Sequence, residues 1–285
     1  MIIGKNRMQV IENIKNAAES GDFYAKVETD DAVLSPAESR EIAARFMGRH
    51  NKRSFRFKAF FARRAANAFT AALNRKTEIV FECEKPDFSH GVFITSNHFG
   101  PIENTAVRHL VRKCGQKKLT IVTQITNLCM KGPLGFLMNY ADTVPIFEDP
   151  HYLNRDFLPL IDSSLKKGIP VLIYPEQEMW FNYKKPRPPK RGVYYFAAKL
   201  SAPIVSLFVE MKELPQKDTD EFYKVKYIIH VLGVLTPDPQ KTAKENSHIM
   251  CERDMELKKA AYERAYQKPL DYTFSPDDIA GLIKK

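Results

Sequence analysis

A histidine and a carboxylate five positions apart are the residues of this chain best suited to chemistry. His98 and Glu103 lie in the run 94–103, which reads Ile-Thr-Ser-Asn-His-Phe-Gly-Pro-Ile-Glu. A histidine held by a carboxylate can act as a general base toward a hydroxyl, because the carboxylate fixes the tautomer and stabilises the imidazolium that forms. The alternative is structural: a half-buried histidine at a strand end, with Glu103 placed favourably in the first turn of a helix.

The elements around this pair decide whether the two side chains can meet. Residues 91–95 are apolar and β-branched, as in a short buried strand, and Pro101 can open a helix at its first turn. On one continuous helix, five residues would place the two side chains about 140° apart. We therefore predict a strand-to-helix turn between His98 and Glu103, which lets both side chains point into one pocket.

Four sequence blocks resemble those of the glycerolipid acyltransferase family, whose best known members are 1-acylglycerol-3-phosphate acyltransferases. The four blocks follow one another in the family's order. Asn97-His98 with Glu103 resembles the NHx4D block, and residues 142–147 resemble the second block. Tyr174-Pro175-Glu176 resembles the Phe-Pro-Glu-Gly of the third, and Pro203-Ile204-Val205 the fourth. Pro189-Lys190-Arg191-Gly192 stands where the family usually has Phe-Lys-x-Gly.

The resemblance implies an enzyme of lipid metabolism and phospholipid biosynthesis. Such an acyltransferase moves a fatty acyl group from a thioester, acyl-CoA or acyl carrier protein, to a hydroxyl of a lysolipid-type acceptor. It implies no metal and no cofactor beyond that donor, and no covalent acyl-enzyme. His98 would be the general base, supported by Glu103, and the substrate-binding residues would be Asn97, Arg155, Glu176, Lys190 and Arg191.

Block three leaves the role of Glu176 open. A proline directly before it turns the chain out of a buried strand, so Glu176 lies at the strand exit. By resemblance it belongs to the acceptor or catalytic pocket; otherwise it pairs with a cation of the run 184–191. That basic run could bind a phosphate or the acidic surface of an acyl carrier protein, or be a solvated loop. Trp180 could line a substrate channel, anchor an interface or pack in the core.

The chain departs from the family where the acceptor's phosphate is usually bound. Glu103 replaces the usual Asp, and block two lacks its Arg, the nearest being Arg155. Blocks two and three instead carry acids, at Glu148, Asp149 and Glu178. A like charge disfavours a phosphate dianion. We expect the acceptor to be a neutral, zwitterionic or amine-bearing lipid with Glu178 or Glu148 near its head group, unless those acids point away and the 184–191 run recognises phosphate.

The pattern of apolar runs predicts an α/β fold with a mainly parallel or mixed sheet flanked by helices. Strands are predicted at 91–96, 119–123, 142–147, 170–174, 203–210 and 224–235, and helices at 35–48, 101–113, 131–140, 154–167 and 191–201. A further helix is predicted from Ser275, and residues 212–224 as an excursion between strands. We assign 77–285 to the acyltransferase domain and 1–76 to a basic, helical N-terminal segment.

Within that segment, residues 40–76 hold eleven Lys or Arg against the single acid Glu41, interleaved with phenylalanines. A helix over 56–73 would place Phe57 and Phe61 on one face and Arg56 and Arg63 away from it. This pattern is typical of a helix lying in a membrane interface over anionic head groups. The alternatives are phenylalanines that pack on the catalytic domain, and a nucleic-acid-binding α/β protein without catalysis.

Composition sets the remaining bounds. The 285 residues carry a net charge of +10, with 44% hydrophobic and 27% charged residues, as in a globular protein. No apolar run reaches the length of a membrane span, and the N-terminus lacks a signal-peptide core. The four cysteines are widely spaced, without a metal-binding pattern. We expect a cytoplasmic protein, peripheral on the inner face of the cell membrane. A hydrolase is disfavoured because no Gly-x-Ser-x-Gly elbow or zincin histidine pair is present.

Overall fold

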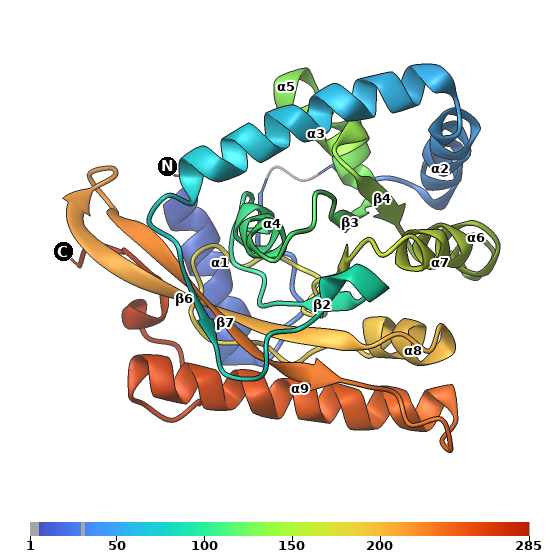
Figure 1. Ribbon diagram of the computed structural model, residues 1–285. Coiled ribbons are helices and arrows are strands. Elements are labelled where there is room, and N and C mark those ends of the chain that lie inside the picture. The colour runs from blue at the N-terminus through green and yellow to red at the C-terminus, as the bar shows by residue number, and fades with distance from the viewer. Residues whose placement is uncertain (1–5, 30–31, 285) are drawn as a thin grey trace.

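A seven-stranded mixed sheet forms the centre of the molecule. The computed structural model describes residues 6–29 and 32–284 (Figure 1). The strands occur in the order β1-β7-β6-β2-β5-β3-β4, and only β6 and β7 pair antiparallel. This confirms the predicted fold class. The strands are β1 (Glu78–Phe81), β2 (Phe93–Thr95), β3 (Thr120–Gln124), β4 (Thr143–Ile146), β5 (Val171–Leu172), β6 (Ile204–Lys217) and β7 (Tyr223–Leu235).

Helices cover both faces of this sheet, which is why β2 and β5 at its centre are almost continuously apolar and buried. One face carries α4 (Asn104–Lys113), which packs on β2, β6 and β7, with α3 (Arg53–Leu73) beyond it. The other face carries α7 (Leu158–Lys166), α8 (Gly192–Lys199) and α9 (Ala243–Tyr266). Figure 1 shows α3 and α4 above the sheet and α8 and α9 below it.

The remaining helical elements lie at the edges of these layers. They are α1 (Arg7–Ser20), α2 (Pro36–His50), α5 (Gly132–Tyr140), α6 (Pro150–Tyr152), the 3-10 turns η1 (Phe88–His90), η2 (Ile125–Cys129) and η4 (Pro276–Asp278), and the π-helical turn η3 (Leu153–Phe157). The carboxyl ends of β2, β5, β3 and β4 lie at one edge of the sheet, because these strands are parallel neighbours. Ligand sites of open α/β sheets occur at this edge.

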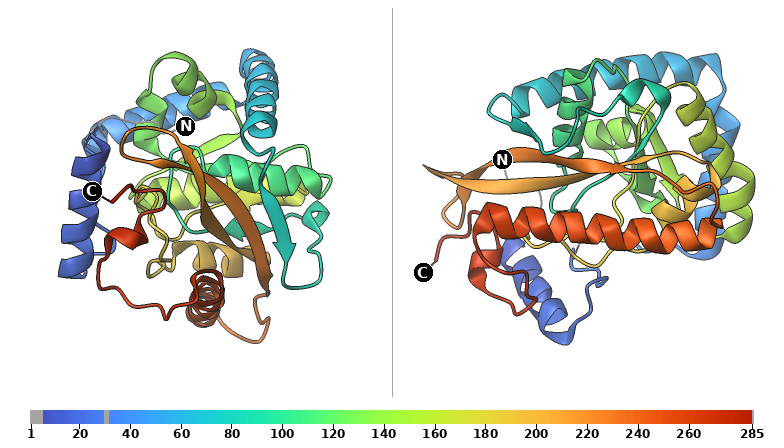
Figure 2. Two further views of the ribbon diagram at one scale, coloured as in Figure 1. Left: turned by 90° about the vertical axis from the view of Figure 1, so that its left-hand side faces the viewer. Right: turned by 60° about the horizontal axis from the view of Figure 1, so that its bottom comes forward.

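All six predicted strands are present, but two of the other predicted segments have a different structure. Residues 212–224 are not an excursion, because β6 continues to Lys217 and β7 begins at Tyr223, forming a long hairpin that extends past the other strands (Figure 2). The helix predicted from Ser275 is only the single turn η4. Its capping box is present, but Ile279 then pairs with Tyr183 as an isolated bridge, which draws the chain into an extended path.

The N-terminal segment packs on the rest of the chain through α1, α2 and α3. α1 packs against Trp180, Phe181, Phe222 and Ile279, and Figure 2 shows it beside the C-terminal segment. α3 is joined to the start of β4 by Arg63, whose guanidinium donates to both Asp142 oxygens at 2.7 and 2.6 Å. A domain boundary near residue 76 stays a prediction.

Candidate active site

His98 and Glu103 meet in the turn between β2 and α4. The chain leaves β2 at Thr95 and enters α4 at Asn104, so the pair lies in the predicted strand-to-helix turn. His98 Nδ1 contacts Glu103 Oε1 in a hydrogen bond, while the His98 side chain is 20% exposed and that of Glu103 only 3%. A neutral imidazole that donates from Nδ1 keeps Nε2 as its acceptor. His98 can therefore take a proton at Nε2.

Glu103 is fixed by more than the histidine. The backbone N–H groups of Phe99 and Gly100 both donate to its Oε2 oxygen, leaving Oε1 for His98. The turn thus holds a carboxylate oxygen against the imidazole, which is the arrangement that stabilises an imidazolium.

Tyr174 covers one face of the His98 imidazole. Its ring stacks on that of His98 with centroids 4.3 Å apart and an angle of 9° between planes. Burial raises the pKa of the Tyr174 hydroxyl well above its usual value, and the nearby Glu103 carboxylate adds to that rise. Tyr174 is therefore a neutral ring that restricts rotation of His98. It follows β5 by two residues, so two neighbouring strands supply this stack.

Glu176 supports the site from beneath instead of lining it. Its side chain is 4% exposed and accepts the His98 backbone N–H at 3.1 Å and the Arg187 backbone N–H at 3.1 Å. The Arg187 guanidinium also pairs with Glu176 at 3.1 Å, and it lies over the Trp180 ring. The geometry thus matches the pairing alternative for Glu176. Burial lowers the pKa of Arg187, partly offset by Glu176.

The backbone of the His98 turn is held on its other side by the segment after Glu176. Trp180 N–H donates to His98 O at 3.1 Å, and Asn182 N–H donates to Phe99 O at 2.8 Å. Trp180 itself is fully buried, and its indole N–H donates to the Ala25 carbonyl. Trp180 is thus a core residue, which fixes the turn through its backbone.

Asn97 has a structural contact in place of a free amide. Its side chain is buried, accepts from Val209 N–H at 2.8 Å and donates to Val209 O at 3.1 Å. These two bonds join the chain after β2 to β6, beyond the last backbone pair, Thr95 with Ser206. We infer that Asn97 positions His98 through the backbone.

The three basic residues that were predicted to bind substrate lie on the surface and make other contacts. Lys190 stands over the ring of Tyr24 at 4.0 Å, and Arg191 contacts His248 of α9. Arg155 lies in η3 and approaches His151 at 3.3 Å. None of the described contacts brings these cations to His98.

The contact between Gln124 and Glu178 lies at the same sheet edge as His98, with β5 between β3 and β2. Gln124 ends β3, and its side-chain amide donates to Glu178 Oε1 at 2.8 Å. Gln124 was not among the predicted site residues. Its position directly after the predicted strand 119–123, at the edge where His98 and Glu176 lie, was the sequence signal that could have identified it.

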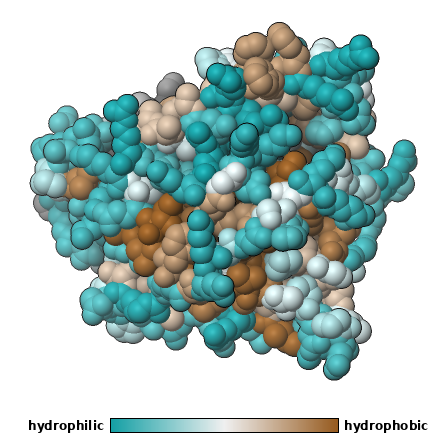
Figure 3. All heavy atoms as spheres, in the orientation of Figure 1, coloured by the Kyte–Doolittle hydropathy of each residue, from teal (hydrophilic) through white to brown (hydrophobic). Residues whose placement is uncertain are grey.

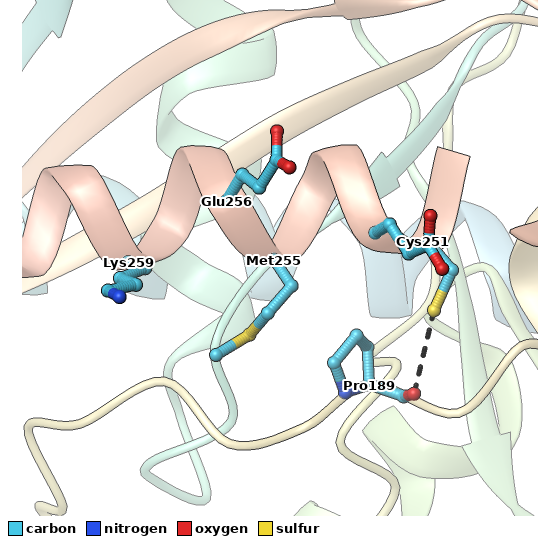
Figure 4. Close-up of a pocket in the computed structure, with 6 residues that line it drawn as sticks. Pro189, Cys251, Met255, Glu256 and Lys259 are labelled. Carbon is cyan, nitrogen blue, oxygen red and sulfur yellow. Dashed lines mark hydrogen bonds between the residues drawn. The ribbon is translucent and has the colours of Figure 1, made fainter. Parts of the chain in front are cut away.

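Two surface cavities lie apart from these residues. One of about 420 Å³ is formed by α9 and the Pro189 backbone, where the buried Cys251 thiol donates to the Pro189 carbonyl (Figure 4). The other, of about 380 Å³, lies between α2 and the η2–α5 segment. His98 lines neither. Across residues 6–29 and 32–284, no group of three or more His, Cys, Asp or Glu is arranged to hold a metal ion.

The surface of α3 keeps much of its aromatic content exposed. Phe57 is 66% exposed, and Phe60 and Phe61 are each 50% exposed. The packed face is instead formed by Phe55, Ala59, Ala62 and Thr70. Beside these phenylalanines, the neighbouring α5 region exposes Met130, Leu134 and Phe136. Figure 3 shows tan apolar side chains among teal hydrophilic ones along the upper edge, where α3 and α5 lie.

Phe57 and Phe61 are therefore largely exposed, whereas Phe46 and Phe55 pack against Leu128, as the alternative of packed phenylalanines expected. α3 also keeps Arg56, Lys58 and Arg64 exposed beside Phe57 and Phe61. Among the helices of the described chain, none is both long and apolar enough to span a bilayer.

Comparison with known proteins supports the fold. No protein-family model matches the sequence, and no curated protein matches it. Among solved structures, the 1-acyl-sn-glycerophosphate (LPA) acyltransferase PlsC from Thermotoga maritima matches over 93% of this chain and 98% of its own. The TM-score is 0.50 and the sequence identity 11%, so the likeness concerns the fold. The chain has the fold of an acyltransferase.

Proposed function

We propose that the protein is an acyltransferase that moves a fatty acyl group from a thioester to a hydroxyl of a lysolipid-type acceptor. The observation that carries the proposal is the His98–Glu103 hydrogen bond. It lies at the carboxyl ends of the parallel strands in an acyltransferase fold. That geometry gives a general base whose free nitrogen faces away from its carboxylate.

The reaction is a direct transfer. His98 Nε2 takes the proton of the acceptor hydroxyl as its oxygen attacks the thioester carbonyl, forming the new C–O bond. The C–S bond breaks as the tetrahedral intermediate collapses, and the imidazolium returns the proton to the leaving thiolate. Glu103 stabilises the imidazolium between these steps, and the stacked Tyr174 ring restricts rotation of the imidazole. Acyl-CoA or acyl carrier protein would supply the thioester.

The α3 surface supports action at a membrane. Its exposed phenylalanines and cations would sit in the interface of an anionic bilayer, where each Lys or Arg near the surface contributes about 1 kcal/mol. Lysolipids and their acylated products reside in such an interface, so docking would bring the enzyme to its acceptor. The protein would then be peripheral on the inner face of the cell membrane.

The test of the activity is product identification. The protein is incubated with an acyl thioester, as acyl-CoA and as acyl carrier protein, and a panel of lysolipids, and the products are identified by mass. His98→Ala should lower the rate by about 10² to 10⁴, as loss of a general base does. His90→Ala is the matched control, because His90 also contacts a carboxylate, Asp87, but at the exposed surface. Wild-type rates for folded His98→Ala would refute the proposal.

A further inference from the structure

Glu103, Glu176 and Glu178 follow β2 and β5 at the sheet edge where transfer is proposed, and the first two each accept several hydrogen bonds within the protein. Glu103 accepts from His98 and two backbone amides, and Glu176 pairs with the buried Arg187. The third, Glu178, is half-buried and accepts only the neutral amide of Gln124. Within residues 6–29 and 32–284, no cation forms an ion pair with Glu178.

The backbone of Glu178 belongs to the segment that is hydrogen-bonded to the His98 turn. Its N–H donates to Glu176 O at 2.9 Å, and its own carbonyl accepts the Arg187 guanidinium. Two residues later, Trp180 N–H bonds the His98 carbonyl. Because β5 lies between β2 and β3, a side chain that follows β5 and reaches Gln124 lies along the edge next to the His98 turn.

The cations that could bind a phosphate beside His98 make other contacts. Arg187 is 1% exposed, and its guanidinium donates to the Glu176 carboxylate and to the carbonyls of Phe23 and Glu178. Lys190 lies over Tyr24, and Arg191 contacts His248. Among the described residues, Glu178 is therefore left without a paired cation, and such a carboxylate disfavours a phosphate dianion beside it and favours a cation.

We propose that Glu178, oriented by Gln124, selects an acceptor whose polar part carries a primary ammonium group. This rests on the proposed acyl transfer and names the class of its acceptor. A half-buried carboxylate that lacks a cation is costly, and an ammonium group offsets that cost with a charge-assisted hydrogen bond. A phosphate monoester in the same place would add repulsion, so its binding is weaker.

The test compares acceptors that share one acyl chain and differ in the head group. Lysolipids bearing a phosphate monoester, phosphoglycerol, phosphocholine or phosphoethanolamine are assayed with the full-length protein and one thioester. The phosphoethanolamine acceptor should have the lowest KM. Glu178→Gln should raise that KM about tenfold with little change in kcat, and Glu178→Lys should move the preference to the phosphate monoester. Gln124→Leu should give part of the Glu178→Gln effect.

Glu252→Gln on α9 is the matched control, because it removes an exposed acid away from the strand ends and should change no KM. The inference is overturned if the phosphate monoester gives the highest kcat/KM, or if Glu178→Gln leaves the order of acceptors unchanged. Either result leaves acyl transfer itself standing, since products still form. Transfer to no acceptor would instead refute the proposed function, and with it this inference.

Discussion

The His98 turn depends on one carboxylate, that of Glu103, for several of its hydrogen bonds. Glu103 must accept from the imidazole and from the amides of Phe99 and Gly100 at once. A side chain that keeps the shape but loses the charge therefore fails differently from one that keeps the charge but is shorter. This separates the electrostatic role of Glu103 from its role in building the turn.

We expect Glu103→Gln to lower kcat by about 10² to 10⁴, because a neutral amide neither stabilises the imidazolium nor enforces the right tautomer. Glu103→Asp should retain more activity than Glu103→Gln, since it keeps the charge. Steady-state rates of both, with circular dichroism to verify folding, measure this. Equal rates for Gln and Asp would show that charge at position 103 is irrelevant.

Tyr174 tests whether the imidazole needs a stacking partner. Tyr174→Phe preserves the ring that stacks at 4.3 Å on His98, so kcat should stay within a few-fold of wild type. Tyr174→Ala removes the ring and leaves a cavity beside His98, which should lower kcat by at least about tenfold and destabilise the fold by about 3 to 5 kcal/mol. The contrast between Phe and Ala, in kcat and in urea unfolding, is the measurement.

At the scale of elements, the sequence predicts those strands and helices whose pattern of apolar residues matches the side chains that are buried. All six predicted strands are present, and the β2 to α4 turn follows from a buried strand and a proline. Helix α9 is absent from the predicted elements because its buried side is partly polar: Asn246, Ser247, Asp254 and Lys258. Asp254 accepts from Thr95, Tyr194, Ser206 and Lys258, partners that come from distant segments. No local pattern encodes such a network.

Two other elements were missed for different reasons. β1 is a four-residue edge strand, too short to show a period. α1 does carry a readable stripe at Val10, Ile11, Ile14, Ala17 and Ala18, which packs on the segment that holds the His98 turn. The pairing of Glu176 with Arg187 depended on a loop path that the sequence leaves open.

The α3 surface gives the prediction at this scale. Replacing Phe57, Phe60 and Phe61 together by Ser should weaken binding to anionic liposomes by more than about tenfold, since each buried phenylalanine contributes about 1.5 to 3 kcal/mol. Wild-type binding should also fall with added salt. Co-sedimentation measures both. The fold should persist, because these rings do not pack in the core.

A control with Val234 and Ile249 replaced by Ser removes exposed apolar side chains from β7 and α9 and should bind like wild type. Unchanged binding of the phenylalanine variant, or binding to oligonucleotides without liposome binding, would contradict membrane docking. Point changes are preferable to removing residues 1–76, because α1 is part of the core around Trp180.

At the scale of the whole molecule, the two edges of the sheet are held in different ways. On the α3 side, Arg63 and Asp142 join helix and strand. On the β1 side, His230 of β7 lies between two carboxylates, with Nδ1 2.9 Å from Glu82 and Nε2 2.9 Å from Glu210. Only a protonated imidazole donates from both nitrogens. The attachment of β1 to the hairpin is thereby linked to pH.

Burial alone would lower the pKa of His230, but its hydrogen bonds to Glu210 and Glu82 outweigh burial and raise it above 6.5. A raised pKa in the folded state means that His230 adds stability fully below about pH 6.5 and loses it as pH rises through the folded pKa. The free energy of unfolding of wild type, minus that of His230→Gln, should therefore be largest below pH 6.5 and decline above it. Urea unfolding from pH 5.5 to 9 measures this difference. The exposed His90→Gln serves as the control, and a His230 difference that grows with pH would show that the imidazole is neutral in the fold.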